Sequence, residues 1–144
     1  MKHLIIPILL SILIISNTTA QSIIGTWKTI DDVTGEAKSH IDIYEDKGKV
    51  YGKISKLLLS AQDKICDTCP GDKKNKNLVG MVVFWDMKND GDNQWSGGKI
   101  LDPENGKTYK CKLWFEEGND NQLNMRGYIG ISLLGRNQQW QRVN

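Results

Sequence analysis

Two cysteines separated by two residues form the most reactive pair in the sequence. Cys66 and Cys69 lie in Cys-Asp-Thr-Cys-Pro-Gly, inside the longest predicted loop. Such a pair can form a disulfide, exchange thiols with a substrate, or supply two ligands to zinc. A thioredoxin-like enzyme needs a βαβ pattern, which this sequence lacks, and zinc needs two further ligands, for which the distant His40 and Cys111 are the only attractive residues. We therefore favour a disulfide between Cys66 and Cys69 over the redox and zinc alternatives.

Acid–base chemistry has few candidates. His40 is the only histidine after residue 20, and it shares a predicted strand face with Asp42. That placement is also ordinary for a solvated strand edge. Cys111 alternates onto one face with Tyr109 and Leu113, which favours a buried free thiol. We therefore expect no catalytic residue, no cofactor and no metal ion, and an enzyme built on His40 or the cysteine pair is the minority hypothesis.

Binding chemistry is concentrated near the end of the chain. Period-two alternation places arginine, glutamine and tryptophan on one face of the last strand, and the preceding segment adds another arginine and a tyrosine. Inside a barrel these groups suit an amphipathic or anionic small molecule, such as a fatty acid or similar carboxylate. The alternative is that they fill a narrow barrel as a satisfied polar network. The predicted ligand-binding residues are Arg126, Tyr128, Arg136, Gln138 and Trp140.

Short strands separated by turns must position these residues. Turn signals such as Asp102-Pro103-Glu104-Asn105-Gly106 divide the chain, and no amphipathic helix of three turns lies between them. The pattern predicts an all-β fold, an eight-stranded antiparallel up-and-down barrel, with a β-sandwich as the alternative. The predicted strands are 24–30, 39–45, 50–58, 78–87, 95–101, 107–115, 122–131 and 136–143.

The first twenty residues predict a signal peptide. Lys2 and His3 form a basic start, an apolar run follows from Leu4 to Ile15, and small residues lead to a cleavage point after Ala20. The run is too short for a helix to span a bilayer core of roughly 30 Å. We expect an exported protein, in a bacterial periplasm or secreted, with one domain over 21–144 and no stable membrane insertion after cleavage.

The charge balance limits the classes of partner. The formal net charge is +2, and loss of Lys2 with the leader lowers it by one. A nucleic-acid binder needs a concentrated basic face, so nucleic acid is not an expected partner. A surface-interaction module with a filled barrel is the second hypothesis. It would use the 60–77 loop to bind a protein partner, because long ordered loops are often functional.

The opening Gly25-Thr26-Trp27 resembles the glycine-any-tryptophan motif on the first strand of lipocalins and the wider calycin group. In those proteins an arginine from near the end of the barrel packs over the indole. The resemblance implies that Gly25 and Trp27 close the barrel with Arg142 or Arg136. A guanidinium over an indole contributes about 0.5–2 kcal/mol. On this interpretation Trp27 is structural and does not contact the ligand.

Several longer motifs are similar to the family catalogued as domain of unknown function 2147, a group of small exported bacterial proteins. They occur in order as GTWKTID, CDTCPG, DPENGKTYKC and MRGYIGISLLGRNQQWQR, and the similarity runs from about Gly25 to Val143. The resemblance implies a calycin-like barrel in the periplasm or outside the cell. It implies no particular activity, because folds host many functions.

Overall fold

A computed structural model describes residues 21–131 and 135–144. The predicted signal peptide, residues 1–20, lies outside the described residues. Within the described part, no helix is long and apolar enough to cross a membrane.

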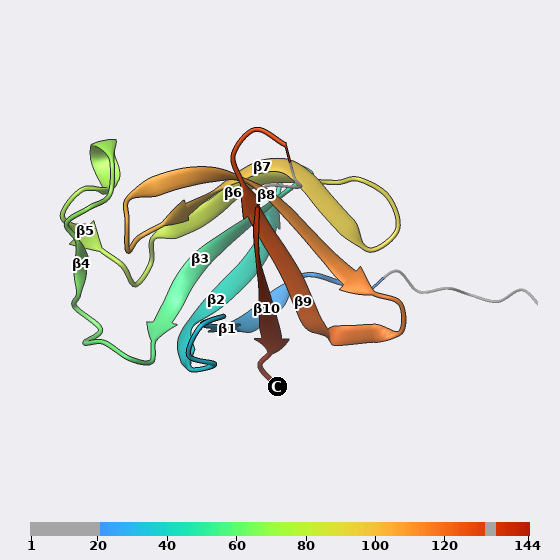
Figure 1. Cartoon of the computed structure of the whole chain (residues 1–144), viewed down its shortest axis with the longest axis horizontal. Coiled ribbons are helices and arrows are strands. Elements are labelled where there is room, and N and C mark those ends of the chain that lie inside the picture. The colour runs from blue at the N-terminus through green and yellow to red at the C-terminus, as the bar shows by residue number, and fades with distance from the viewer. Residues whose placement is uncertain (1–20, 132–134) are drawn as a thin grey trace, which may run out of the picture.

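Eight strands form a closed antiparallel barrel, which confirms the predicted fold and excludes the sandwich (Figure 1). Each strand pairs with the next one of the barrel along the chain, and the last pairs with the first, so no edge is left open. The register Trp27↔Arg142 joins the two ends of the sequence. The barrel strands are β1 (Gly25–Ile30), β2 (Ala37–Asp46), β3 (Lys49–Leu57), β6 (Val82–Asn89), β7 (Gln94–Asp102), β8 (Lys107–Glu116), β9 (Asn119–Tyr128) and β10 (Arg136–Arg142).

The up-and-down order sorts the connections into two ends. The β1–β2, β3–β6, β7–β8 and β9–β10 connections lie at one end, which we call the mouth. The tight turns β2–β3, β6–β7 and β8–β9 lie at the other end, with residues 21–24 and the C-terminus. Side chains on alternate positions of a strand point into the barrel. Each strand can therefore contribute residues to the half of the interior near the mouth and to the half away from it.

The β3–β6 connection contains structure that the sequence pattern did not predict. The two-residue strands β4 (Ile65–Cys66) and β5 (Lys76–Asn77) pair with each other, and the short 3₁₀ helix η1 (Gly71–Lys73) lies between them, to one side of the barrel (Figure 1). The predicted Cys66–Cys69 disulfide is present and buried. Thr68 Oγ1 donates to the carbonyl of Pro103 at 2.7 Å. The disulfide segment is therefore docked on the β7–β8 turn.

The half of the barrel away from the mouth is filled. Trp27 is fully buried there, its ring 5.7 Å from that of Phe115, and Phe115 contacts Trp95 edge-on at 5.7 Å. Leu113 and Leu123 are also fully buried. Aromatic and leucine side chains therefore pack this half as an ordinary protein core.

Arg142 covers the closed end. Its guanidinium lies 4.2 Å from the centre of the Trp27 ring and donates to the carbonyls of Ser22, Ile24 and Asp120. Gly25 makes room for it, since a Cβ there would lie 3.3 Å from Arg142 Nη1. The guanidinium thus joins the segment before β1 to the start of β9. Arg136, the other arginine considered for this role, lies at the mouth.

Candidate functional site

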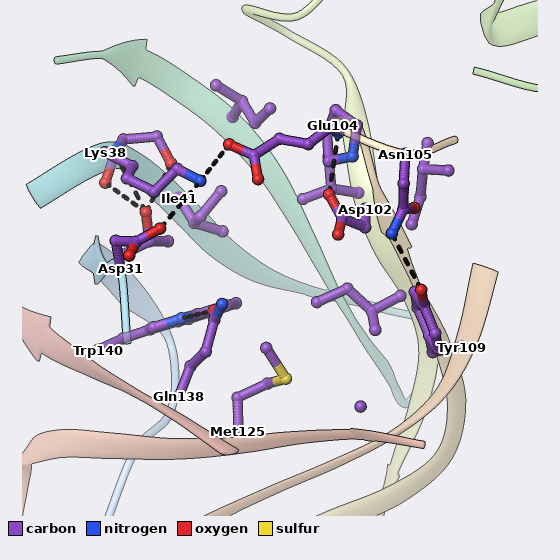
Figure 2. Close-up of a pocket in the computed structure, with 18 of the residues that line it drawn as sticks. Asp31, Lys38, Ile41, Asp102, Glu104, Asn105, Tyr109, Met125, Gln138 and Trp140 are labelled. Atoms are coloured by element: carbon purple, nitrogen blue, oxygen red, sulfur yellow. Dashed lines mark hydrogen bonds and ion pairs between the residues drawn. The ribbon is translucent and has the colours of Figure 1, made fainter. Parts of the chain in front are cut away.

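The mouth half of the barrel is hollow. A cavity of about 570 Å³ occupies this half and reaches the mouth. Figure 2 shows residues that line it. None of Trp27, Phe115 and Trp95 lines it. Apolar residues from several strands and connections line it, and they include Ile41, Ile54, Leu57, Leu78, Val83, Ile100, Leu101, Met125 and Trp140.

The inward-facing residues of β9 and β10 shape this half of the barrel. Gly127 on β9 lines the cavity without a side chain, while Met125 two residues earlier fills its position with a flexible one. Trp140 forms part of the floor, with its ring 6.2 Å from that of buried Phe84. Trp140 Nε1 donates to Gln138 Oε1 at 3.2 Å, which satisfies the indole N–H beside the cavity. The cavity wall therefore combines apolar side chains with polar and charged ones, which include Thr29, Ser39 and the ionisable residues of the mouth.

An ion-pair bridge crosses the mouth. Lys38 at the start of β2 contacts Asp31 Oδ2 at 3.5 Å and also pairs with Glu104 in the β7–β8 turn (Figure 2). Strands β2 and β7 lie three places apart in the barrel order, nearly opposite each other. Burial lowers the pKa of Lys38, but its two carboxylate partners outweigh that effect and raise the pKa above its ordinary value. Lys38 is therefore a fixed cation over the cavity.

Asp31 is the anchored partner of this bridge. Its Oδ1 accepts the backbone N–H groups of Val33 at 2.9 Å and Thr34 at 2.8 Å. Hydrogen bonds from Thr34 and then Val33, with a contribution from Lys38, lower the pKa of Asp31 to about 2. Glu104 differs, because 68% of its side chain is exposed. One carboxylate on Lys38 is thus held by the loop, and the other extends into water.

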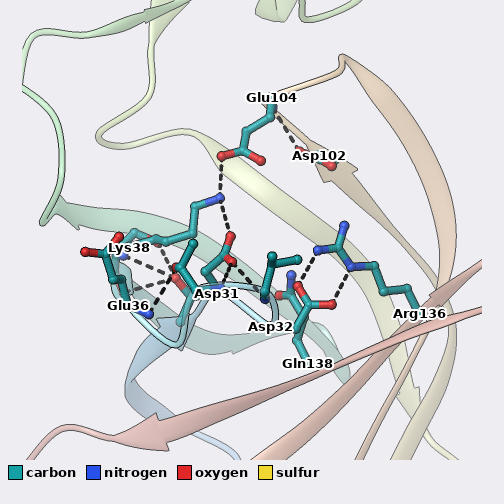
Figure 3. Close-up of polar contacts among 12 residues, drawn as sticks. Asp31, Asp32, Glu36, Lys38, Asp102, Glu104, Arg136 and Gln138 are labelled. Carbon is teal, nitrogen blue, oxygen red and sulfur yellow. Dashed lines mark hydrogen bonds and ion pairs between the residues drawn. The ribbon is translucent and has the colours of Figure 1, made fainter.

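A second ion pair lies at the same rim. Arg136 at the start of β10 donates through Nε and Nη2 to the two carboxylate oxygens of Asp32 (Figure 3). The hydrogen bond from Arg136 lowers the pKa of Asp32, and the same contact raises the pKa of Arg136. A two-pronged contact of this kind holds the guanidinium in one orientation. Tyr109 also lies on the cavity, and its hydroxyl oxygen accepts a hydrogen bond from Asn105 Nδ2 at 3.0 Å.

The structure places four of the predicted ligand-binding residues on the cavity and one outside it. Tyr128, Arg136, Gln138 and Trp140 line the cavity. Arg126 lies on the outer face of the barrel, where its Nη1 donates to Asn137 at 2.6 Å. At this point of β9 Gly127 faces inward, and Arg126 and Tyr128 alternate with it. Tyr128 nevertheless lines the cavity, because it is the last residue of the strand and lies at the mouth. We leave Arg126 out of the candidate site.

The residues considered for chemistry are not gathered at the cavity. His40 pairs across the sheet with Lys28 and Lys56, and Asp42 Oδ1 accepts from Thr26 Oγ1 at 2.8 Å. Cys111 is fully buried in β8, and burial raises the pKa of its thiol to about 12. Among the described residues, no group of three or more His, Cys, Asp or Glu side chains could hold a metal ion.

Sequence reasoning missed the charged residues of the rim. Asp31, Lys38 and Glu104 occur in or beside predicted turns, where polar residues are expected for backbone reasons alone. A signal was available, because alternate turns of an up-and-down barrel meet at one end. Reading the β1–β2 and β7–β8 turns together would have placed these charges around one opening.

The barrel is similar to a solved structure, that of protein HP1028 from the human pathogen Helicobacter pylori, which belongs to the lipocalin family. The two align with a TM-score of 0.75 and 21% identity over 85% of this chain and 84% of that one. A likeness at this identity establishes the fold, which is lipocalin-like. A search of curated proteins finds no match. The family described as "Uncharacterized protein conserved in bacteria (DUF2147)" matches residues 25–142, in agreement with the motif resemblance, and the chain belongs to that family.

Proposed function

We propose that this protein is exported and holds a small amphipathic molecule in its barrel without changing it chemically. The observation that carries the proposal is the apolar chamber of about 570 Å³ beneath a charged mouth. Ligand pockets in proteins commonly measure about 300–1,000 Å³ and combine apolar walls with a few polar groups that fix orientation. The chamber falls within this size range, and its wall combines apolar side chains with polar and charged ones near the mouth.

The apolar wall favours a ligand with a hydrocarbon part. Burial of apolar surface contributes about 25 cal/mol per Å², and each buried methylene contributes about 0.8 kcal/mol. A chain of several methylenes, placed between Trp140 at the floor and Tyr128 near the mouth, would gain most of its affinity in this way. The polar end of such a ligand would remain at the rim.

An anionic head group suits this rim. It can replace the exposed carboxylate of Glu104 beside Lys38, while Asp31 keeps its contact with the same ammonium. Glu104 then returns to water at little cost because its side chain is already largely exposed. Arg136 contributes less directly, since Asp32 already occupies its guanidinium.

Export is supported by two features. The pattern of residues 1–20 predicts a leader removed after Ala20, and the disulfide is of the kind that persists in oxidising compartments. We propose a location in the periplasm or outside the cell. The surface-interaction hypothesis is less favoured, because the mouth half of the barrel is hollow and the disulfide segment packs on the barrel through Thr68 and Pro103.

The test is to fill the chamber from one position. The atoms nearest to a Cβ on Gly127 would belong to Ile100 and Tyr109, no closer than 3.7 Å, so a side chain can be added there without a clash at its base. Gly127→Ala and Gly127→Leu form a size series. We expect a fluorescent fatty-acid analogue to bind the wild type and the alanine variant, and to bind the leucine variant at least tenfold more weakly.

Native mass spectrometry on protein isolated from its producing cells gives the complementary measurement. A bound small molecule released on denaturation would identify the ligand class. Equal probe binding by the folded Gly127→Leu variant would contradict the proposal, because the probe would then lie outside the chamber. Circular dichroism and the unfolding midpoint establish that each variant is folded.

A further inference from the structure

Exposed aliphatic side chains are concentrated at one end of the molecule. Among the residues that the structure describes, six large hydrophobic side chains are exposed, and five of them lie on connections at the mouth. Their exposed fractions run from 46% for Ile65 to 82% for Val33. The sixth, Ile24, is 41% exposed and precedes β1 at the closed end. The five at the mouth are Val33, Leu59, Ile65, Ile129 and Ile131.

These side chains come from three connections around one opening. Val33 lies between β1 and β2, Leu59 between β3 and β6, and Ile129 between β9 and β10. Leu59 and Ile129 also line the cavity, so its apolar wall continues onto the outer surface of the mouth. Val33 is held in place, because its N–H donates to the anchored carboxylate of Asp31 at 2.9 Å.

We propose that the protein docks mouth-first on a lipid bilayer, with these aliphatic residues inserted among the acyl chains. The inference rests on the proposed function, because a bilayer is both a source and a destination for an amphipathic ligand. In the docked state the apolar wall of the chamber continues into the membrane. The ligand can then move between the two without exposing its hydrocarbon part to water.

The residue types favour a bilayer over a protein partner. Binding hot spots between proteins are enriched in tryptophan, tyrosine and arginine, whereas leucine and valine are under-represented. The exposed large hydrophobic residues at the mouth are valine, leucine and isoleucine. These side chains also lie on separate connections around the mouth of the barrel. The acyl chains of a fluid bilayer can surround each of them individually, whereas a folded protein partner would need a surface shaped to fit all of them. Tyr128, next to Ile129 at the rim, lies where interfacial tyrosines are favoured.

The charges of the rim make a further distinction. Lys38 is paired with Asp31 and Glu104, and Arg136 with Asp32, so these two cations at the opening are balanced by nearby carboxylates. Attraction to anionic lipids through a basic patch would fade with added salt. Docking through aliphatic insertion should instead occur on neutral phosphatidylcholine and persist at high salt.

The experiment is flotation with phosphatidylcholine vesicles. The variant Val33→Ser/Ile131→Ser removes two exposed side chains that do not line the cavity, and Ile24→Ser is the matched control at the closed end. We expect the double variant to partition to vesicles at least about tenfold more weakly than the wild type, and the control to partition like the wild type. Intact-mass measurement should show that the wild type and all variants begin at the same residue. Residues 1–20 then cannot account for a difference in flotation between them.

Uptake of the fluorescent fatty-acid analogue in vesicle-free solution separates this inference from the proposed function. The double variant should load the probe normally. A wild type that loads the probe but does not float would overturn the docking proposal alone. So would flotation that requires phosphatidylglycerol and disappears in salt, or a dimer in light scattering that the double substitution dissociates. Flotation without probe uptake would support docking and count against the proposed function.

Discussion

Asp31 performs two tasks at the mouth with one carboxylate. One oxygen orders the β1–β2 connection by accepting two backbone N–H groups, and the other pairs with Lys38 above the chamber. The carboxylate must be ionised for both contacts to reach full strength. Its lowered pKa therefore reports on the order of the loop that presents Val33 and on the position of Lys38.

We predict that the Asp31 carboxyl titrates with a pKa of about 2 in the folded protein, against an ordinary value of 3.8. A folded-state pKa below the unfolded value means that this group stabilises the fold fully above pH 3.8 and loses the effect as the pH falls toward 2. Asp31→Asn should accordingly have a lower unfolding midpoint than the wild type at neutral pH. The difference should shrink across that acidic interval.

Side-chain NMR titration measures the pKa of Asp31. Thermal unfolding at several pH values measures how the difference in unfolding midpoint between the wild type and Asp31→Asn depends on pH. Asp63→Asn is a suitable control, because Asp63 is an exposed acid for which no corresponding contact is found. An Asp31 pKa near 3.8 would show that the two backbone hydrogen bonds are not maintained in solution.

Close packing between β3 and β6 depends on a single glycine. At Gly52 an added Cβ would lie 2.1 Å from Phe84 Cε1, and Phe84 is fully buried, so its ring has no space to withdraw. The register between β3 and β6 also shifts on either side of Gly52. A glycine is needed at this position because the Phe84 ring occupies the place of a side chain.

We predict that Gly52→Ala destabilises the protein by about 1–3 kcal/mol, the usual cost of overpacking a core. Gly127→Ala is the matched control, since its Cβ has only ordinary contacts at 3.7 Å or more, and we expect a change within about 0.5 kcal/mol. Urea unfolding measures both. Equal stability of the two variants would mean that β3 and β6 can separate without cost.

On the scale of the whole molecule, the barrel divides into a packed half and a hollow half. Trp27 and Arg142 belong to the packed end, and Lys38 and Arg136 belong to the open end. Closure through Arg142 satisfies three backbone carbonyls as well as covering an indole. We therefore expect contacts at the closed end to contribute more to the stability of the fold than contacts at the rim of the cavity do.

Two arginines on the same face of β10 test this division. Arg142→Ala should destabilise the protein by about 2 kcal/mol or more, through loss of the cation–π contact and of the charged hydrogen bonds to backbone carbonyls. Arg136→Ala removes an exposed ion pair and should cost about 1 kcal/mol or less. Chemical denaturation of both variants provides the comparison. Equal costs would contradict the assignment of stability to the closed end.

The sequence by itself favoured the barrel over a sandwich and the disulfide over a redox or zinc site, and the structure confirms both choices. Period-two alternation and turn residues are local signals, and they mark eight strands joined mostly by short connections. Closing such a sheet into a barrel leaves no strand edge exposed. The sequence also determined the face of β10 that carries Gln138 and Trp140. It did not predict the short strands β4 and β5, whose two-residue pairing leaves no periodic pattern to detect.

Only the tertiary structure decided that the barrel is hollow at one end and filled at the other. Alternation assigns a side chain to the interior, but the space that remains depends on the sizes of side chains from all eight strands at the same level. The bridge from Lys38 to Glu104 joins residues 66 positions apart, and no local pattern encodes such a pair. Arg126 lies on the face of β9 opposite Leu123 and Met125, and it does not line the cavity.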